Sequence, residues 1–197
     1  MKKIITAFFL AAIFSQTVFS GDKLISVNRI PANTEEFVYM RNVQSNSPEG
    51  GAAMFIMSMI IYTTDKNLGM QCATIALDQT RLVSGSTYKG FTPDKSAAEK
   101  IAALSEKAKS FIPFSYIVKT DPDRDYKAVL PFTFSFRDMP NNLRSENEAK
   151  VFVVSSGDQA PRAVYMKRND KGIWKVTNFE GLMKDVIQPV HKKGDDL

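Results

Sequence analysis

The sequence predicts an α+β fold in which a helical N-terminal half packs on a C-terminal antiparallel sheet of three to four strands. Apolar residues recur every three or four positions as far as Phe111, which is the spacing of amphipathic helices. Beyond Pro113 they alternate with polar residues, as Phe132, Phe134 and Phe136 do, and this spacing is typical of strands. The helices carry the only large apolar surface that could cover the sheet, so a helix layer on a sheet is expected.

The first twenty residues predict export. Lys2 and Lys3 precede an apolar run over residues 4–14, and residues 18–20 suit a cleavage site that ends at Ser20. Residues 1–20 are therefore predicted to be a signal peptide, and the processed protein is expected to be periplasmic or secreted. The run is too short to span a bilayer, and no later segment reaches the necessary length, so no transmembrane span is expected.

The remaining 177 residues have a length typical of one domain. We expect an extended lead-in over residues 21–33, a single α+β domain over 34–188 and a flexible tail over 189–197. Without Lys2 and Lys3, 24 basic residues stand against 21 acidic ones, and an excess of +3 is too small to favour nucleic acid as a partner.

Capping residues mark the starts of four predicted helices. Each start places an oxygen-bearing side chain before an apolar run. Ser47 shows the pattern most clearly, because Pro48 then occupies the first helical position, where its missing N–H costs nothing. The four starts are at Thr34, Ser47, Thr64-Asp65 and Thr92-Pro93-Asp94, the last of which offers two overlapping starts.

Apolar content distinguishes two of these helices. Residues 52–62 are almost all apolar, which predicts a helix buried on nearly all sides. Its methionines could line a ligand cavity or fill irregular core space, and core filling is the favoured interpretation. The last helix has apolar residues on one face between Ala97 and Phe111, and this face is expected to pack on its own domain rather than on a membrane.

Strands are predicted over residues 132–137, 150–155, 162–168 and 173–179. The Asn-Asp-Lys-Gly sequence at 169–172 predicts a turn between the last two. Lys167, Arg168, Lys171 and Lys175 beside this turn form the densest basic group. A solvated hairpin rim is favoured there over an anion-binding or membrane-surface patch.

Cysteine and histidine usage excludes several kinds of catalysis. Cys72 is the only cysteine, so no internal disulfide can form, and its apolar surroundings favour packing as a small hydrophobe. His191 is the only histidine and falls in the predicted tail, where a general base could not be held in place. Catalytic triads and zinc sites built from these residues are not expected, and neither is a cofactor.

Several separated sequence blocks occur in a recognisable order. They are residues 47–53, Tyr62, Asp65, 88–90, 112–113, 115–117, 153–157, 161–162 and 169–175. Together they resemble an uncharacterised family of small exported bacterial α+β proteins with no assigned activity. The resemblance spans roughly residues 34–190 and implies no catalytic residue or cofactor, and two loops depart from the family pattern, at residues 118–125 and 158–160.

Alternating acids at Asp121, Asp123 and Asp125 raise the question of a calcium loop. A helix-loop-helix calcium site needs glycine at its sixth position and a bidentate acid at its twelfth, where this chain has Tyr126 and Phe132. A plain turn is favoured, and no metal site is expected.

The loop after residue 154 is the favoured binding surface. Its hydroxyls, a glycine that frees backbone N–H groups and a guanidinium could hold an anionic or sugar ligand, although the same residues also suit a hairpin loop. Two aromatic residues could add an apolar wall. The candidate ligand-binding residues are Ser155, Ser156, Gly157, Arg162, Tyr116 and Trp174.

Two functions follow from these observations. The favoured one is an exported non-enzymatic domain that binds a small ligand or an envelope protein. The alternative is a small hydrolase or isomerase that uses carboxylates in a pocket between sheet and helices. The position of the carboxylates distinguishes the two, because acid–base catalysis needs an acid in a concave apolar cavity.

Overall fold

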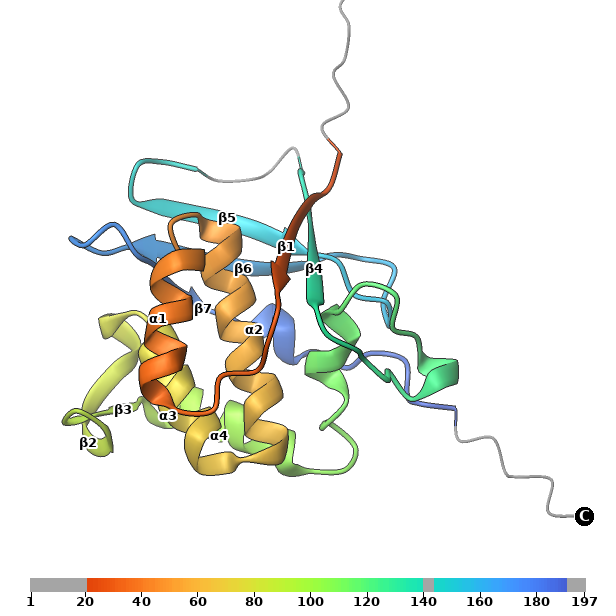
Figure 1. Ribbon diagram of the computed structural model, residues 1–197, viewed down its shortest axis with the longest axis horizontal. Coiled ribbons are helices and arrows are strands. Elements are labelled where there is room, and N and C mark those ends of the chain that lie inside the picture. The colour runs from red at the N-terminus through yellow and green to blue at the C-terminus, as the bar shows by residue number, and fades with distance from the viewer. Residues whose placement is uncertain (1–20, 140–143, 191–197) are drawn as a thin grey trace, which may run out of the picture.

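The computed structural model describes residues 21–139 and 144–190, so the predicted signal peptide and His191 lie outside the described residues. The described chain has the predicted α+β architecture (Figure 1). Its helices are α1 (Thr34–Gln44), α2 (Pro48–Thr64), α3 (Lys66–Ala76) and α4 (Lys95–Ala102). Its strands are β1 (Lys23–Val27), β2 (Leu82–Tyr88), β3 (Phe91–Pro93), β4 (Phe132–Arg137), β5 (Glu148–Val153), β6 (Arg162–Arg168) and β7 (Trp174–Asn178).

Side-chain caps begin each of these helices within two residues of the predicted positions. Ser47 Oγ accepts a hydrogen bond from the backbone N–H of Gly50 at 3.2 Å, which confirms the start of α2. Asn33, Asp65 and Asp94 cap α1, α3 and α4 in the same way. Asp65 and Asp94 belong to the predicted starts, whereas the cap of α1 is Asn33 rather than the predicted Thr34.

Helix α2 forms the centre of the core, as its composition predicts. Its residues from Pro48 to Tyr62 are all buried. Figure 1 shows α2 lying between α1, α3 and the sheet, so every side of the helix meets protein. The side chains of Met54, Met57 and Met59 are completely buried in this core, which agrees with the core-filling interpretation.

The main sheet has five antiparallel strands in the order β1-β4-β5-β6-β7, rather than the three or four predicted. The extra strand is β1, which lies in the segment predicted as a lead-in. Only Ile25 and Val27 on β1 point toward the core, while Leu24 is 60% exposed, so the alternation is too short to be recognised. Strands β4 and β5 pair over just two residue pairs, and Figure 1 shows β1 and β4 crossing the other three strands at a steep angle.

Two other segments differ from the prediction. Strands β2 and β3 form a hairpin in a region where no strand was predicted, and its turn uses Lys89 and Gly90 with positive φ. The last helix was predicted to extend toward Phe111, but α4 ends at Ala102. A short 3₁₀ turn follows, and Glu106 is extended, so the later apolar residues reach the core from turns rather than from a helix.

Candidate functional site

The hydroxyl groups of the predicted binding loop are hydrogen-bonded inside the protein. Ser155 Oγ donates to Ser115 Oγ at 2.9 Å and accepts from the backbone N–H of Gly157 at 3.1 Å. Ser156 Oγ lies 3.0 Å from both the Ser115 carbonyl oxygen and Thr120 Oγ1. The loop therefore fastens strand β5 to the segment 115–120, and whether it also binds a ligand stays a prediction.

Arg162 and Tyr116 lie beside this loop and also have internal partners. Arg162 pairs with the carboxylate of Asp158, and its Nη2 donates to the Asp185 carbonyl oxygen at 2.9 Å. The Tyr116 hydroxyl donates to the Leu182 carbonyl oxygen at 2.9 Å, and burial raises the pKa of this phenol well above its usual value. These contacts hold the C-terminal segment against the loop.

Trp174 is the one predicted site residue that lies away from the others. It begins strand β7, its side chain is buried, and its backbone N–H donates to the Ser45 carbonyl oxygen at 2.8 Å beside the start of α2. The structure thus brings together Tyr116, Arg162 and residues 155–157, but not Trp174.

Replacing Arg162 with alanine is expected to lower the free energy of unfolding by about 1–3 kcal/mol, because the largely buried guanidinium holds both Asp158 and the Asp185 carbonyl group. Urea unfolding would measure the loss. Arg168→Ala removes an exposed guanidinium and should change stability by less than about 0.5 kcal/mol. Equal stability of the Arg162 variant and the wild type would contradict this structural role.

The acids at positions 121–125 lie on a short 3₁₀ turn. Asp121 accepts hydrogen bonds from the backbone N–H of Arg124 at 2.9 Å and from its Nε at 2.6 Å, so it caps a short 3₁₀ turn. Asp125 follows with positive φ. Among residues 21–139 and 144–190, no three carboxylate, imidazole or thiol groups come close enough to hold a metal ion.

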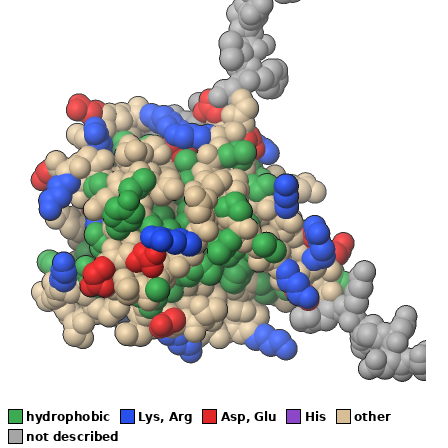
Figure 2. All heavy atoms as spheres, in the orientation of Figure 1, with side chains coloured by type: hydrophobic (Ala, Val, Ile, Leu, Met, Phe, Trp, Pro, Cys, Tyr) green, Lys and Arg blue, Asp and Glu red, His purple; other side chains and the backbone are tan. Residues whose placement is uncertain are grey.

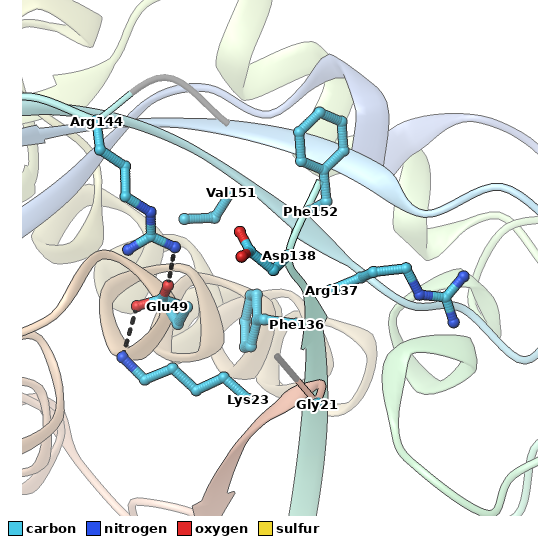
Figure 3. Close-up of a pocket in the computed structure, with 9 residues that line it drawn as sticks. All are labelled: Gly21, Lys23, Glu49, Phe136, Arg137, Asp138, Arg144, Val151 and Phe152. Carbon is cyan, nitrogen blue, oxygen red and sulfur yellow. Dashed lines mark hydrogen bonds and ion pairs between the residues drawn. The ribbon is translucent and has the colours of Figure 1, made fainter. Parts of the chain in front are cut away.

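Glu49 is the carboxylate that lies between helices and sheet, as the enzymatic alternative requires. It stands at the start of α2, is only 1% exposed, and lines a cavity of about 320 Å³ (Figure 3). Figure 3 shows its two oxygens directed at two different cations. Lys23 Nζ donates to Oε2 at 2.8 Å, and Arg144 Nη2 donates to Oε1. The carboxylate thereby ties β1 and the segment before β5 to α2.

These contacts determine the protonation state of Glu49. Burial alone would raise the pKa of its carboxyl group, but the hydrogen bonds from Lys23 and Arg144 outweigh burial and lower the pKa below its usual value. A general acid at neutral pH needs the opposite shift. Glu49 is therefore an ionised structural carboxylate and a weak base.

Asp78 is the other buried acid in the described part of the chain. Its Oδ1 accepts hydrogen bonds from the backbone N–H of Thr80 at 3.0 Å and from the Thr80 hydroxyl at 2.8 Å. It lines a different cavity from the one beside Glu49. The two buried carboxylates are thus not arranged as a catalytic pair.

Of the cavities described, the one with the largest volume lies on the outward side of β1 and β4, where no site residue was predicted. This β1–β4 groove has a volume of about 600 Å³ and is open to solvent. Six apolar residues, three hydroxyl residues and three cations line it, and none of the lining residues is acidic. They are Leu24, Ser26, Ile117, Val118, Lys119, Thr120, Arg124, Lys127, Ala128, Val129, Pro131 and Thr133.

The segment 117–131 forms one wall of the β1–β4 groove, and contacts with the protein interior hold this segment in place. Tyr126 is buried, stacks on Phe111 with ring centres 5.6 Å apart, and donates from its hydroxyl to the Ile187 carbonyl oxygen at 2.5 Å. Thr120 Oγ1 forms a hydrogen bond with Ser156 Oγ of the predicted binding loop. The predicted binding loop therefore contacts the segment 117–131 on the side away from the groove.

The segment 117–131 also carries unusual backbone conformations. Lys119, Asp125 and Tyr126 have φ values of 72°, 54° and 51°, in the left-handed region that non-glycine residues seldom adopt. Backbone strain of this kind persists only where the surrounding contacts impose it. The anchors at Tyr126 and Thr120 supply such contacts and hold the wall in one shape.

Apolar side chains are exposed at the β1–β4 groove. Val129 is 83% exposed and Val118 is 38% exposed. Figure 2 shows apolar side chains next to basic ones on the part of the surface above β1, β4 and the segment 117–131. Within the described residues, every helix is too short or too polar to cross a membrane.

Comparison with known proteins gives a family but no activity. A family model described as a domain of unknown function (DUF6935) matches residues 29–190. No curated protein and no solved structure matches the chain. The match covers all four helices and four strands of the main sheet. It begins after β1, so it includes the lining of the β1–β4 groove except for the residues on β1. The chain therefore belongs to the DUF6935 family.

Proposed function

We propose that this protein is an exported, non-enzymatic domain that binds an extended acidic segment of another envelope protein in the β1–β4 groove. The observation that carries the proposal is the lining of that groove, which combines apolar residues and cations without any acid. Clustered apolar exposure with a charged rim is typical of protein interaction sites.

The charges at the rim favour an acidic partner. Arg124 is paired with Asp121, but Lys119 and Lys127 make no ion pair within the described part of the chain. Both lysines are exposed, so carboxylates of a partner can reach them. Charge complementarity of this kind contributes to partner choice and to the rate of association.

The floor of the groove favours an extended partner. Leu24 and Ser26 point outward from β1, and Ser26 Oγ meets Thr133 Oγ1 of β4 at 2.9 Å, so the floor is a pleated two-strand surface. An extended chain presents alternate side chains to opposite sides. In a partner segment whose acidic residues alternate with apolar ones, the apolar side chains would therefore lie on the floor of the groove. The acidic side chains would then lie near the rim.

Export is part of the proposal because the N-terminal twenty residues have the pattern of a signal peptide. Mass spectrometry of the protein purified from its own envelope or medium should give a mature chain that begins at Gly21. An intact chain that begins at Met1 in the cytosol would contradict export.

The enzymatic alternative has less support. A carboxylate-dependent hydrolase or isomerase needs an acid and a base near one substrate position. Glu49 is paired with two cations, its pKa is lowered, and Asp78 lines a different cavity. Each cavity has a second carboxylate in its lining, Asp138 beside Glu49 and Asp170 beside Asp78. In the first cavity Glu49 is held ionised by two cations, and in the second Asp78 accepts two hydrogen bonds from Thr80, so neither buried acid is poised as a general acid.

Fluorescence polarisation with a labelled peptide tests the binding site. The probe is a synthetic decapeptide of alternating glutamate and leucine, compared with one of alternating lysine and leucine. The acidic peptide should bind, and Lys119→Glu with Lys127→Glu should weaken its binding at least tenfold, because two attractive charges become repulsive. The control is Arg168→Glu with Lys171→Glu, which makes the same change in net charge at the end of β6 and in the turn that follows it.

Four outcomes would contradict the proposal. The acidic peptide could fail to bind, both double variants could lose affinity equally, or the basic peptide could bind as well as the acidic one. Binding to phosphatidylglycerol vesicles in place of the peptide would also contradict it, because the groove would then serve a membrane surface.

A further inference from the structure

A second group of basic side chains lines another cavity, separate from the β1–β4 groove. Lys167 and Arg168 at the end of β6, Lys171 in the following turn and Lys175 on β7 line about 330 Å³ of space beside Asp78. In residues 21–139 and 144–190, none of these four cations forms an ion pair. Positive charge is therefore in excess here.

Lys175 carries its charge in a partly buried position. Its Nζ donates to the Ile75 carbonyl oxygen at 2.8 Å and to the Leu77 carbonyl oxygen at 3.4 Å, at the end of α3. An ammonium group has three donors, so these contacts leave one for a ligand. Burial lowers the pKa of Lys175 to about 8, repulsion from Arg41 acts in the same direction, and attraction to Asp78 offsets them in part.

The neighbouring acids offset this charge only in part. Asp78 and Asp170 also line the cavity, so four cations stand against two carboxylates. Arg41 on α1, which repels Lys175, is partly buried, and its Nε has no hydrogen-bond partner in the described chain. Burying uncompensated positive charge is costly, and a bound anion would remove part of that cost.

We infer that this cavity binds a tetrahedral oxyanion, phosphate or sulfate, either free or carried on a small molecule. Such a group offers several acceptor oxygens, and ammonium and guanidinium donors form their strongest hydrogen bonds with ionised acceptors. Lys175 supplies a donor at the inner end of the cavity, while Lys167, Arg168 and Lys171 supply donors from the hairpin. The inference is independent of the β1–β4 groove.

Calorimetric titration of the chain that begins at Gly21, with sodium phosphate and with sodium sulfate at constant ionic strength, tests the site. Sodium chloride is the reference. Both oxyanions should bind saturably, and Arg168→Gln with Lys171→Gln should weaken them about tenfold or more through the loss of charge-assisted contacts. Both side chains are exposed, so this variant should fold. Lys175→Met should also abolish binding if it stays folded by circular dichroism.

Lys119→Gln with Lys127→Gln is the matched control, because it removes two other exposed cations and should leave oxyanion binding unchanged. Glucose 6-phosphate distinguishes the two sources of the group. If it binds with the same dependence on Arg168 and Lys171, the site accepts the group on a small molecule, and if only the free anions bind, the site is closed to larger ligands. The absence of saturable binding by either anion, or an equal loss in the control, would overturn the inference.

Discussion

Replacing Gly69 with alanine is expected to lower the free energy of unfolding by about 3 kcal/mol or more. A methyl group at this position of α3 would lie 2.6 Å from the Tyr62 side chain on α2 and even closer to the Tyr62 backbone. Both separations are too short for van der Waals contact. Two helix backbones cannot move apart here without opening the core, because a single residue, Asp65, joins the helices. The gain in helix propensity, at most about 1 kcal/mol, cannot compensate.

Urea unfolding monitored by circular dichroism would measure this effect. The control is Asn67→Ala, an exposed position on the same helix, which should change stability by no more than about 0.5 kcal/mol. Wild-type stability of the Gly69 variant would mean that α2 and α3 do not pack as closely as described.

Replacing Glu49 with glutamine is expected to cost about 2 kcal/mol at neutral pH, since it removes charge-assisted hydrogen bonds from a buried position. Lys23 and Arg144 are each about half exposed, so water can solvate them after the change, and the loss stays below that for a fully buried pair. Glu99→Gln removes an exposed carboxylate and should leave stability almost unchanged.

The effect of Glu49 should depend on pH in one direction. Its folded-state pKa is lowered, so its contribution to stability is complete above the unfolded pKa of about 4.3 and is lost as the pH falls through the folded-state value. The stabilities of the wild type and the glutamine variant should therefore converge in acid. A difference that grows as the pH falls would show that Glu49 is protonated in the folded protein.

The elements that the sequence predicts well are those with strong local signals. Ser47 and Pro48 define the start of α2, and a continuous apolar run predicts its burial. The turn at residues 169–172 follows from Asn169, whose Oδ1 accepts two backbone hydrogen bonds, and from Gly172, which has positive φ. Each of these features depends on a few adjacent residues.

The elements that escaped prediction depend on distant partners. Strand β1 has only two inward residues, and it is a strand because β4, more than a hundred positions later, pairs with it. The β1–β4 groove likewise combines Leu24 with Val118 and Val129 and has no local motif. The run 127–131, where exposed apolar residues follow Lys127 outside any strand, is the one sequence signal that could have indicated it.

The binding loop was predicted from residue types that serve folding equally well. Hydroxyls, glycine and arginine suit an anion site, but they also suit a loop that bonds to neighbouring backbone groups. In the structure Ser155, Ser156 and Arg162 each bond to a backbone group, and Ser155 also donates to the Ser115 hydroxyl. Sequence alone could not distinguish the two, because the partners come from residues 115–120 and 182–187.

Methyl NMR spectroscopy gives the most direct test of the proposed binding site. In a titration with the alternating glutamate–leucine peptide, the methyl signals of Leu24, Val118 and Val129 should shift together and saturate. The signals of Val83 on β2 and Val43 on α1, which are exposed elsewhere, should stay in place. Shifts confined to Val83 or Val43, or no shifts at saturating peptide, would contradict binding in the β1–β4 groove.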